Sequence, residues 1–147
     1  MSVKKHCFLI FYLLIVFIFQ ACSSLETPPL IKATDQGQLD AVNQLIAQGI
    51  DVNSATPEGV TPLFIASANG HEDIAKRLID NGADVNAATT MTFDYEDVTV
   101  YKGCTSLLAA AANRRTRIAN MLIAQGADVN ACDINGSTPL MAAAVQS

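Results

Sequence analysis

Gly82-Ala83-Asp84-Val85-Asn86 is one of three nearly identical pentapeptides in this chain. Residues 126–130 repeat it without change, and residues 49–53 differ from it at a single position. Counted from their first residues, the copies lie 33 and 44 residues apart. Self-similarity with a period of roughly 20 to 50 residues predicts a solenoid of stacked repeats.

A second motif keeps the same phase along the chain. It is a leucine with an alanine three residues later, and in three of its four copies a threonine stands two residues before the leucine. Threonine is a favoured N-cap and proline a favoured first helical residue, so the motif predicts the start of a short helix. The copies are Pro29-Leu30, Thr61-Pro62-Leu63, Thr105-Ser106-Leu107 and Thr138-Pro139-Leu140, whose leucines lie 33, 44 and 33 residues apart.

A further apolar stripe follows each of the first three predicted helices. Its residues fall on one face of a helix, which indicates a second, amphipathic helix in each repeat. Each helix pair alone has too little apolar area to be stable, so the pairs must stack on one another. The stripes are Val42, Leu45 and Ile46; Ile74, Leu78 and Ile79; and Ile118, Leu122 and Ile123.

The two motifs and their 33-residue period resemble the ankyrin repeat. The resemblance extends over residues 28–147, which we expect to form about three full repeats plus a partial fourth. It implies an all-α solenoid of helix-turn-helix repeats with β-hairpin fingers, one of them extended. Because the final repeat stops after one helix, the chain is interpreted as a C-terminally truncated fragment or as one whose last repeat lacks its covering helix.

Two departures from the family pattern bear on packing. The family has a histidine after Thr-Pro-Leu that hydrogen-bonds across repeats. In this chain we expect apolar packing in place of those hydrogen bonds. Arg114 stands where two earlier repeats have Gly37 and Gly70, and a left-handed backbone there costs a non-glycine residue ~1 kcal/mol. The residues at the histidine position are Ile31, Phe64, Leu108 and Met141.

Residues 1–21 are predicted to be a signal peptide. A basic run from Lys4 to His6 precedes the unbroken apolar run 8–19. These 12 residues are too few for a membrane-spanning helix, which needs ~20.

Cys22 is the expected lipidation site. Phe19-Gln20-Ala21-Cys22 resembles the lipobox of bacterial lipoproteins, although Phe19 and Gln20 depart from its leucine and small residue. The resemblance implies palmitate-type acylation of Cys22, a tether over residues 22–27 and anchoring in the cell envelope. Ser23 after the cysteine favours the periplasmic face of the outer membrane.

The 11 additional residues of the 44-residue interval lie within Ala87–Gly103. Residues 90–101 alternate and are rich in β-branched and aromatic side chains, which predicts a two-stranded hairpin with an acidic tip. Its aromatic residues either bind a partner or pack the hairpin onto the helices. Calcium binding by the acidic residues lacks the required ligand spacing. The candidate partner-binding residues are Phe93, Asp94, Tyr95, Glu96, Asp97 and Tyr101.

Arginines and cysteines leave further alternatives open. Arg114, Arg115 and Arg117 form either a solvated cluster or a contact for an acidic partner. Cys104 and Cys132 are expected to be small buried thiols, with a disulfide as the alternative in an oxidising compartment.

Composition argues against catalysis and nucleic-acid binding. The chain has a net charge of −5, which repels phosphate backbones. It has no catalytic triad order, phosphate loop or CxxC spacing, so no catalytic residue, metal, cofactor or small-molecule substrate is expected. Two functions therefore compete: a membrane-anchored protein that binds a protein partner, or a structural envelope lipoprotein that associates with itself.

Overall fold

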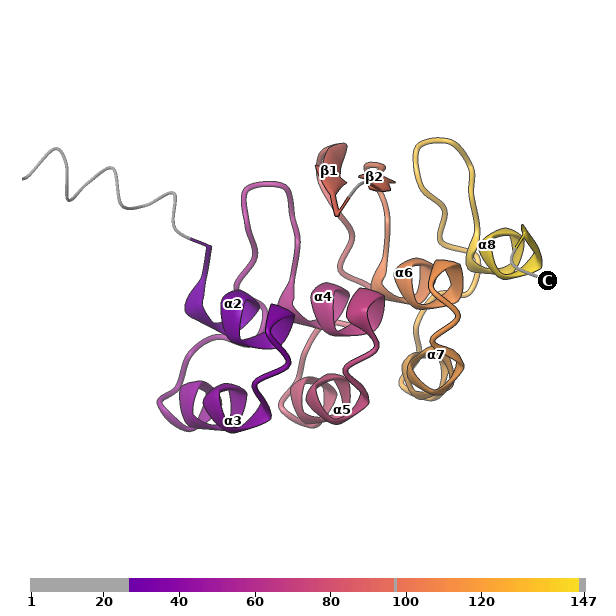
Figure 1. Cartoon of the computed structure of the whole chain (residues 1–147). Coiled ribbons are helices and arrows are strands. Elements are labelled where there is room, and N and C mark those ends of the chain that lie inside the picture. Colours follow the sequence, from indigo (N-terminus) through magenta and orange to yellow (C-terminus); the bar gives the residue numbers. More distant parts are fainter. Residues whose placement is uncertain (1–26, 97, 146–147) are drawn as a thin grey trace, which may run out of the picture.

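The computed structural model describes residues 27–96 and 98–145, which form two rows of short helices with loops projecting from one side (Figure 1). The inner row consists of α2, α4, α6 and α8, and the outer row of α3, α5 and α7. This arrangement confirms the predicted all-α solenoid. The elements are α2 (Pro29–Asp35), α3 (Leu39–Ala47), α4 (Pro62–Asn69), α5 (Glu72–Asp80), β1 (Phe93–Tyr95), β2 (Val98–Val100), α6 (Ser106–Ala112), α7 (Thr116–Ala124) and α8 (Pro139–Val145).

Threonine caps start three of the inner helices, as the sequence predicts. Thr61 Oγ1 accepts a hydrogen bond from the backbone N–H of Phe64 at 3.1 Å. Thr105 Oγ1 accepts the equivalent bond from Leu108 at 3.3 Å. Because these bonds satisfy N–H groups that have no partner inside the helix, each threonine fixes where its helix begins.

The turn between the two helices of a repeat requires a left-handed residue. Gly70 ends α4 with φ 85°, and Arg114 takes the same region with φ 59°. The predicted strain at Arg114 is therefore present in the structure.

The core lies in two clusters. The larger one joins the helix rows through side chains such as Leu63, Leu78 and Leu122. The smaller one lies under the fingers and contains Ile31, Phe64 and Leu108, which confirms apolar packing at the histidine position of three repeats.

In the fourth repeat, this expectation is wrong. Met141 is 58% exposed, and among the described residues no further repeat covers that side of α8. Leu140 and Val145 of the same helix are likewise exposed.

Asparagines join neighbouring repeats. Asn86 Nδ2 donates to the Gly126 carbonyl at 3.3 Å, and Asn86 Oδ1 accepts from the Asp128 N–H at 2.8 Å. Asn53 makes the equivalent pair of bonds to Gly82 and Asp84. The last residue of the repeated pentapeptide thus acts as a two-point bridge to the next repeat.

The predicted signal peptide and the lipidation site Cys22 lie outside the described residues. Among the residues that are described, no helix has both the length and the apolar character needed to cross a bilayer.

Candidate functional site

The extended finger is the two-stranded hairpin that the sequence predicts. Strands β1 and β2 are antiparallel, with Phe93 opposite Val100, Asp94 opposite Thr99 and Tyr95 opposite Val98. Thr99 Oγ1 donates to Asp94 Oδ1 at 2.9 Å, so this carboxylate is already engaged across the strands.

Of the acidic residues expected at the tip, Glu96 lies in the turn, exposed, with φ 44°. Asp97 lies outside the described residues.

The base of the finger is held by the fingers on either side. The Thr90 N–H donates to the Glu58 carbonyl at 2.7 Å in the preceding finger. On the other side, the Ile134 N–H donates to the Lys102 carbonyl at 2.8 Å. Gly59 permits the first approach, because a Cβ atom there would lie 2.8 Å from the Thr90 nitrogen. The hairpin therefore stands at a fixed position above the inner helices.

The predicted aromatic residues of the finger do not share one environment. Phe93 is partly buried and packs with Val100 on the core cluster under the fingers. Tyr101 is 41% exposed and lines a hollow, as does Glu96. For Tyr95 the structure gives only its place opposite Val98 in the hairpin.

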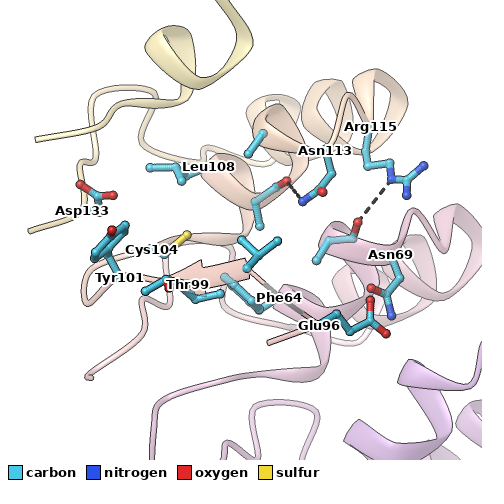
Figure 2. A pocket seen from close by; sticks show the side chains of 15 residues that line it. Phe64, Asn69, Glu96, Thr99, Tyr101, Cys104, Leu108, Asn113, Arg115 and Asp133 are labelled. Atoms are coloured by element: carbon cyan, nitrogen blue, oxygen red, sulfur yellow. Dashed lines mark hydrogen bonds between the residues drawn. The ribbon is translucent and has the colours of Figure 1, made fainter. Parts of the chain in front are cut away.

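A hollow of about 410 Å³ lies between the finger and the inner helices α4 and α6. Figure 2 shows Arg115, Asn69 and Glu96 on one side of it and Tyr101 and Asp133 on the other. The floor and one wall are largely apolar, which suits a desolvated side chain of a ligand. The floor residues are Phe64, Ala68, Leu108, Ala109 and Ala112, and the finger contributes Val98, Thr99, Val100 and Tyr101.

A second hollow of about 350 Å³ continues along the inner face. Leu108, Ala112 and Asp133 line both hollows, so the two lie next to each other and the second reaches α8. We call the two adjacent hollows together the finger groove.

The polar residues of the groove are partly oriented by the helices. Arg115 Nε donates to the Ala68 carbonyl at 3.3 Å, and Asn113 Nδ2 donates to the Ala109 carbonyl at 2.9 Å (Figure 2). These bonds hold the two side chains against α4 and α6.

The three arginines do not act as one patch. Arg115 lines the groove, whereas Arg117 forms an ion pair with Glu72 at 3.2 Å on the outer row. Arg114 takes the strained turn position described above.

The two cysteines are free thiols with different surroundings. Cys104 is buried at the groove wall, as expected. For Cys132 the expectation of burial is wrong, because this residue lies exposed next to Asp133 on the following finger. Burial, with a smaller contribution from the negative charge of Asp133, raises the pKa of the Cys104 thiol to about 12.

Much of this site was missed by reasoning from sequence. The candidates lay within the finger, whereas the floor comes from Ala68, Leu108 and Ala112 on the helices. The run of alanines in residues 109–112 was the available signal, because small side chains on an inner helix leave room beside a finger. No group of three or more potential metal ligands exists within the described part of the chain.

Two family models of ankyrin repeats match the chain. One describes ankyrin repeats in three copies and matches residues 2–89. The other describes ankyrin repeats in many copies and matches residues 64–123 and 107–146. No curated protein gives a significant match. The matched ranges include the inner helices and the finger that form the groove.

Proposed function

The chain belongs to the ankyrin-repeat family, whose repeats imply protein partners, and on this basis we propose that its finger groove binds a segment of a partner protein at the bacterial envelope. The observation that carries the proposal is the apolar hollow of about 410 Å³ beneath a finger that both neighbouring fingers brace. A preformed site binds with a smaller loss of conformational freedom than a site that must be ordered.

The chemistry of the groove fits a protein segment. Leu108 offers apolar surface on the floor and Val98 on the finger, and Tyr101 adds a half-exposed aromatic ring. Apolar and aromatic surface with a few oriented polar groups is typical of recognition sites. Glu96, the exposed acidic residue of the turn, stands at the rim, where a charge contributes to specificity more than to affinity.

Two matched valine substitutions test the groove. Val98 lines the hollow and is 61% exposed, and Val129 lies outside both hollows and is 48% exposed. The full chain would be used to select binders from a random dodecapeptide phage library, and the selected peptides would be titrated against Val98→Glu and Val129→Glu. Binding should fall at least tenfold for Val98→Glu and stay unchanged for Val129→Glu. Equal effects of the two substitutions, or no enriched peptide, would overturn the proposal.

The envelope location is a separate part of the proposal. It is supported by the basic run before the apolar residues 8–19 and by Ala21-Cys22-Ser23, which match the small residue, cysteine and tether of a lipoprotein signal. Cleavage before Cys22 would leave a diacylglycerol-modified cysteine, and several acyl chains together give stable membrane attachment. The repeats would then face the periplasm from the outer membrane.

Mass spectrometry of the N-terminal peptide tests the anchor. Protein expressed in a Gram-negative cell should begin at Cys22 and carry acyl mass, and Cys22→Ser should move the chain from the membrane to the soluble fraction. An unmodified cysteine in the membrane-extracted protein would refute the anchor without affecting the groove.

A further inference from the structure

We propose that Arg115 is the specificity-determining residue of the finger groove and that it selects a protein segment carrying a carboxylate beside a large apolar residue. The inference rests on the proposed binding function and adds the chemistry of the partner.

The guanidinium of Arg115 lies against the C-terminal end of α4 in the preceding repeat. Its Nε donates to the Ala68 carbonyl at 3.3 Å, near the end of α4. Its Cδ, Nε and Cζ atoms cover Gly70, where a Cβ atom would come within 2.7 to 2.9 Å of them. The side chain therefore crosses from one repeat to the next in a fixed direction, which reduces the entropy that it would lose on binding a ligand.

The two Nη atoms of Arg115 remain available to a ligand. Within the described part of the chain, they take part in neither a hydrogen bond nor an ion pair, and Arg115 as a residue is exposed. Since Nε is engaged by Ala68, the remaining donors form a fork that matches the two oxygens of a carboxylate. A guanidinium in this arrangement binds a planar anion in preference to a neutral amide.

Apolar surface lies beside this fork. Arg115 lines the same hollow as Phe64 and Leu108 (Figure 2). Val98 of the finger also lines it. Because the guanidinium and this apolar surface line one hollow, the carboxylate and the apolar side chain that contact them should be close in the sequence of the ligand, within about three positions at ~3.3 Å per extended residue.

The groove continues toward α8 through Leu108 and Ala112, so the rest of the segment can lie along it. Glu96, on the same side of the hollow as Arg115 (Figure 2), disfavours a segment with acidic residues throughout, so a single carboxylate is preferred.

The test uses the peptides selected by the full chain from the random dodecapeptide library. The expected sequences share an aspartate or glutamate within three positions of a large apolar residue. Each selected peptide would be synthesised twice, once with its aspartate or glutamate and once with that residue replaced by asparagine or glutamine. The unaltered chain should bind the acidic form at least tenfold more tightly, because charge-assisted bidentate bonds are the strong class.

Substitutions at Arg115 separate recognition from folding. Arg115→Gln should remove the preference between the two peptides, Arg115→Lys should keep part of it, and Arg115→Glu should select basic peptides from the same library. Circular dichroism of each variant would confirm that the repeats remain folded. Arg117→Gln is the matched control, because Arg117 is paired with Glu72 on the outer row and should leave the preference intact.

The outcomes distinguish the two proposals. Peptides that lose binding to Val98→Glu but show no carboxylate, or whose preference survives Arg115→Gln, would overturn the role of Arg115 while leaving groove binding intact. A library that yields no binder would instead contradict the binding function on which the inference rests.

Discussion

Arg115 lies directly over Gly70, and a Cβ atom at Gly70 would come 2.7 Å from the Arg115 Nε atom. His71 has the same relationship to Gly37 one repeat earlier, where a Cβ would come 2.9 Å from the ring carbon Cε1. In both pairs, the residue after the inter-helix turn reaches back to the turn glycine of the preceding repeat. These glycines therefore have two roles: they take the left-handed conformation, and they leave room for the neighbour's side chain.

A comparison of Gly70→Ala with Gly82→Ala should separate these two roles. Both glycines have φ 85°, but a Cβ at Gly82 has no atom within 4 Å. Gly82→Ala should therefore cost ~1 kcal/mol from backbone strain alone. Gly70→Ala should cost somewhat more than Gly82→Ala, because the guanidinium end of Arg115 must also move away from the Ala68 carbonyl. Urea unfolding of both variants measures the difference, and equal losses would show that the contact with Arg115 is unimportant.

Arg114 should be a site where the chain can be stabilised. It adopts φ 59° without the freedom of glycine, so Arg114→Gly should relieve ~1 kcal/mol of strain. Arg114 also makes a further interaction, so replacing it by glycine can change more than the strain. Arg114→Ala controls for this effect, since it keeps the strain and deletes the side chain. The free energy of unfolding of Arg114→Gly should exceed that of Arg114→Ala by ~1 kcal/mol, and a smaller value for the glycine variant would contradict the strain.

The fold could be predicted because its determinants are local. Thr61 and Thr105 cap helices through bonds that span three residues, so a short motif is sufficient to place each helix start. The left-handed turn at Arg114 followed from its alignment with Gly70. The bridge made by Asn86 did not follow, because its partners lie 40 and 42 residues away and only the stacking of repeats brings them together.

The site was less predictable, for the same reason. The hairpin was recognisable from its alternating residues, but its direction is set by backbone contacts such as that from Thr90 to Glu58. Whether Phe93 faces a partner or the core depends on that direction, and it faces the core. Arg115 takes its place in the groove through contacts with Gly70 and Ala68 in another repeat. The sequence spacing of the arginines therefore could not predict that role.

The asparagine bridge gives a prediction with an internal control. Asn86→Ala should destabilise the solenoid by ~1 kcal/mol, because two exposed hydrogen bonds between repeats are lost. Asn130 holds the same position in the next pentapeptide, and within the described part of the chain its side chain makes no such bridge. Asn130→Ala should therefore change the free energy of unfolding by less than ~0.5 kcal/mol. A loss at Asn130 as large as that at Asn86 would show that the bridge is not the cause.

The cysteines should differ in reactivity. At pH 8, iodoacetamide should modify exposed Cys132 within minutes and leave buried Cys104 unmodified until urea unfolds the chain, as peptide mass spectrometry would show. Modification of both thiols at one rate in the folded protein would contradict the burial of Cys104.

The raised pKa of Cys104 also makes stability depend on pH. Its pKa is about 12 in the fold, against an ordinary value of 9.0, so the fold favours the protonated thiol. Below pH 9 the thiol is protonated in both states, and this contribution to stability is fully present. Above pH 9 the unfolded chain ionises first, and the contribution is lost as pH rises toward 12. Because lysines and tyrosines titrate in the same range, Cys104→Ala supplies the reference. Urea unfolding between pH 8 and about 11 should show a steeper loss of stability for the unaltered chain than for this variant, and parallel losses would place the thiol in contact with water.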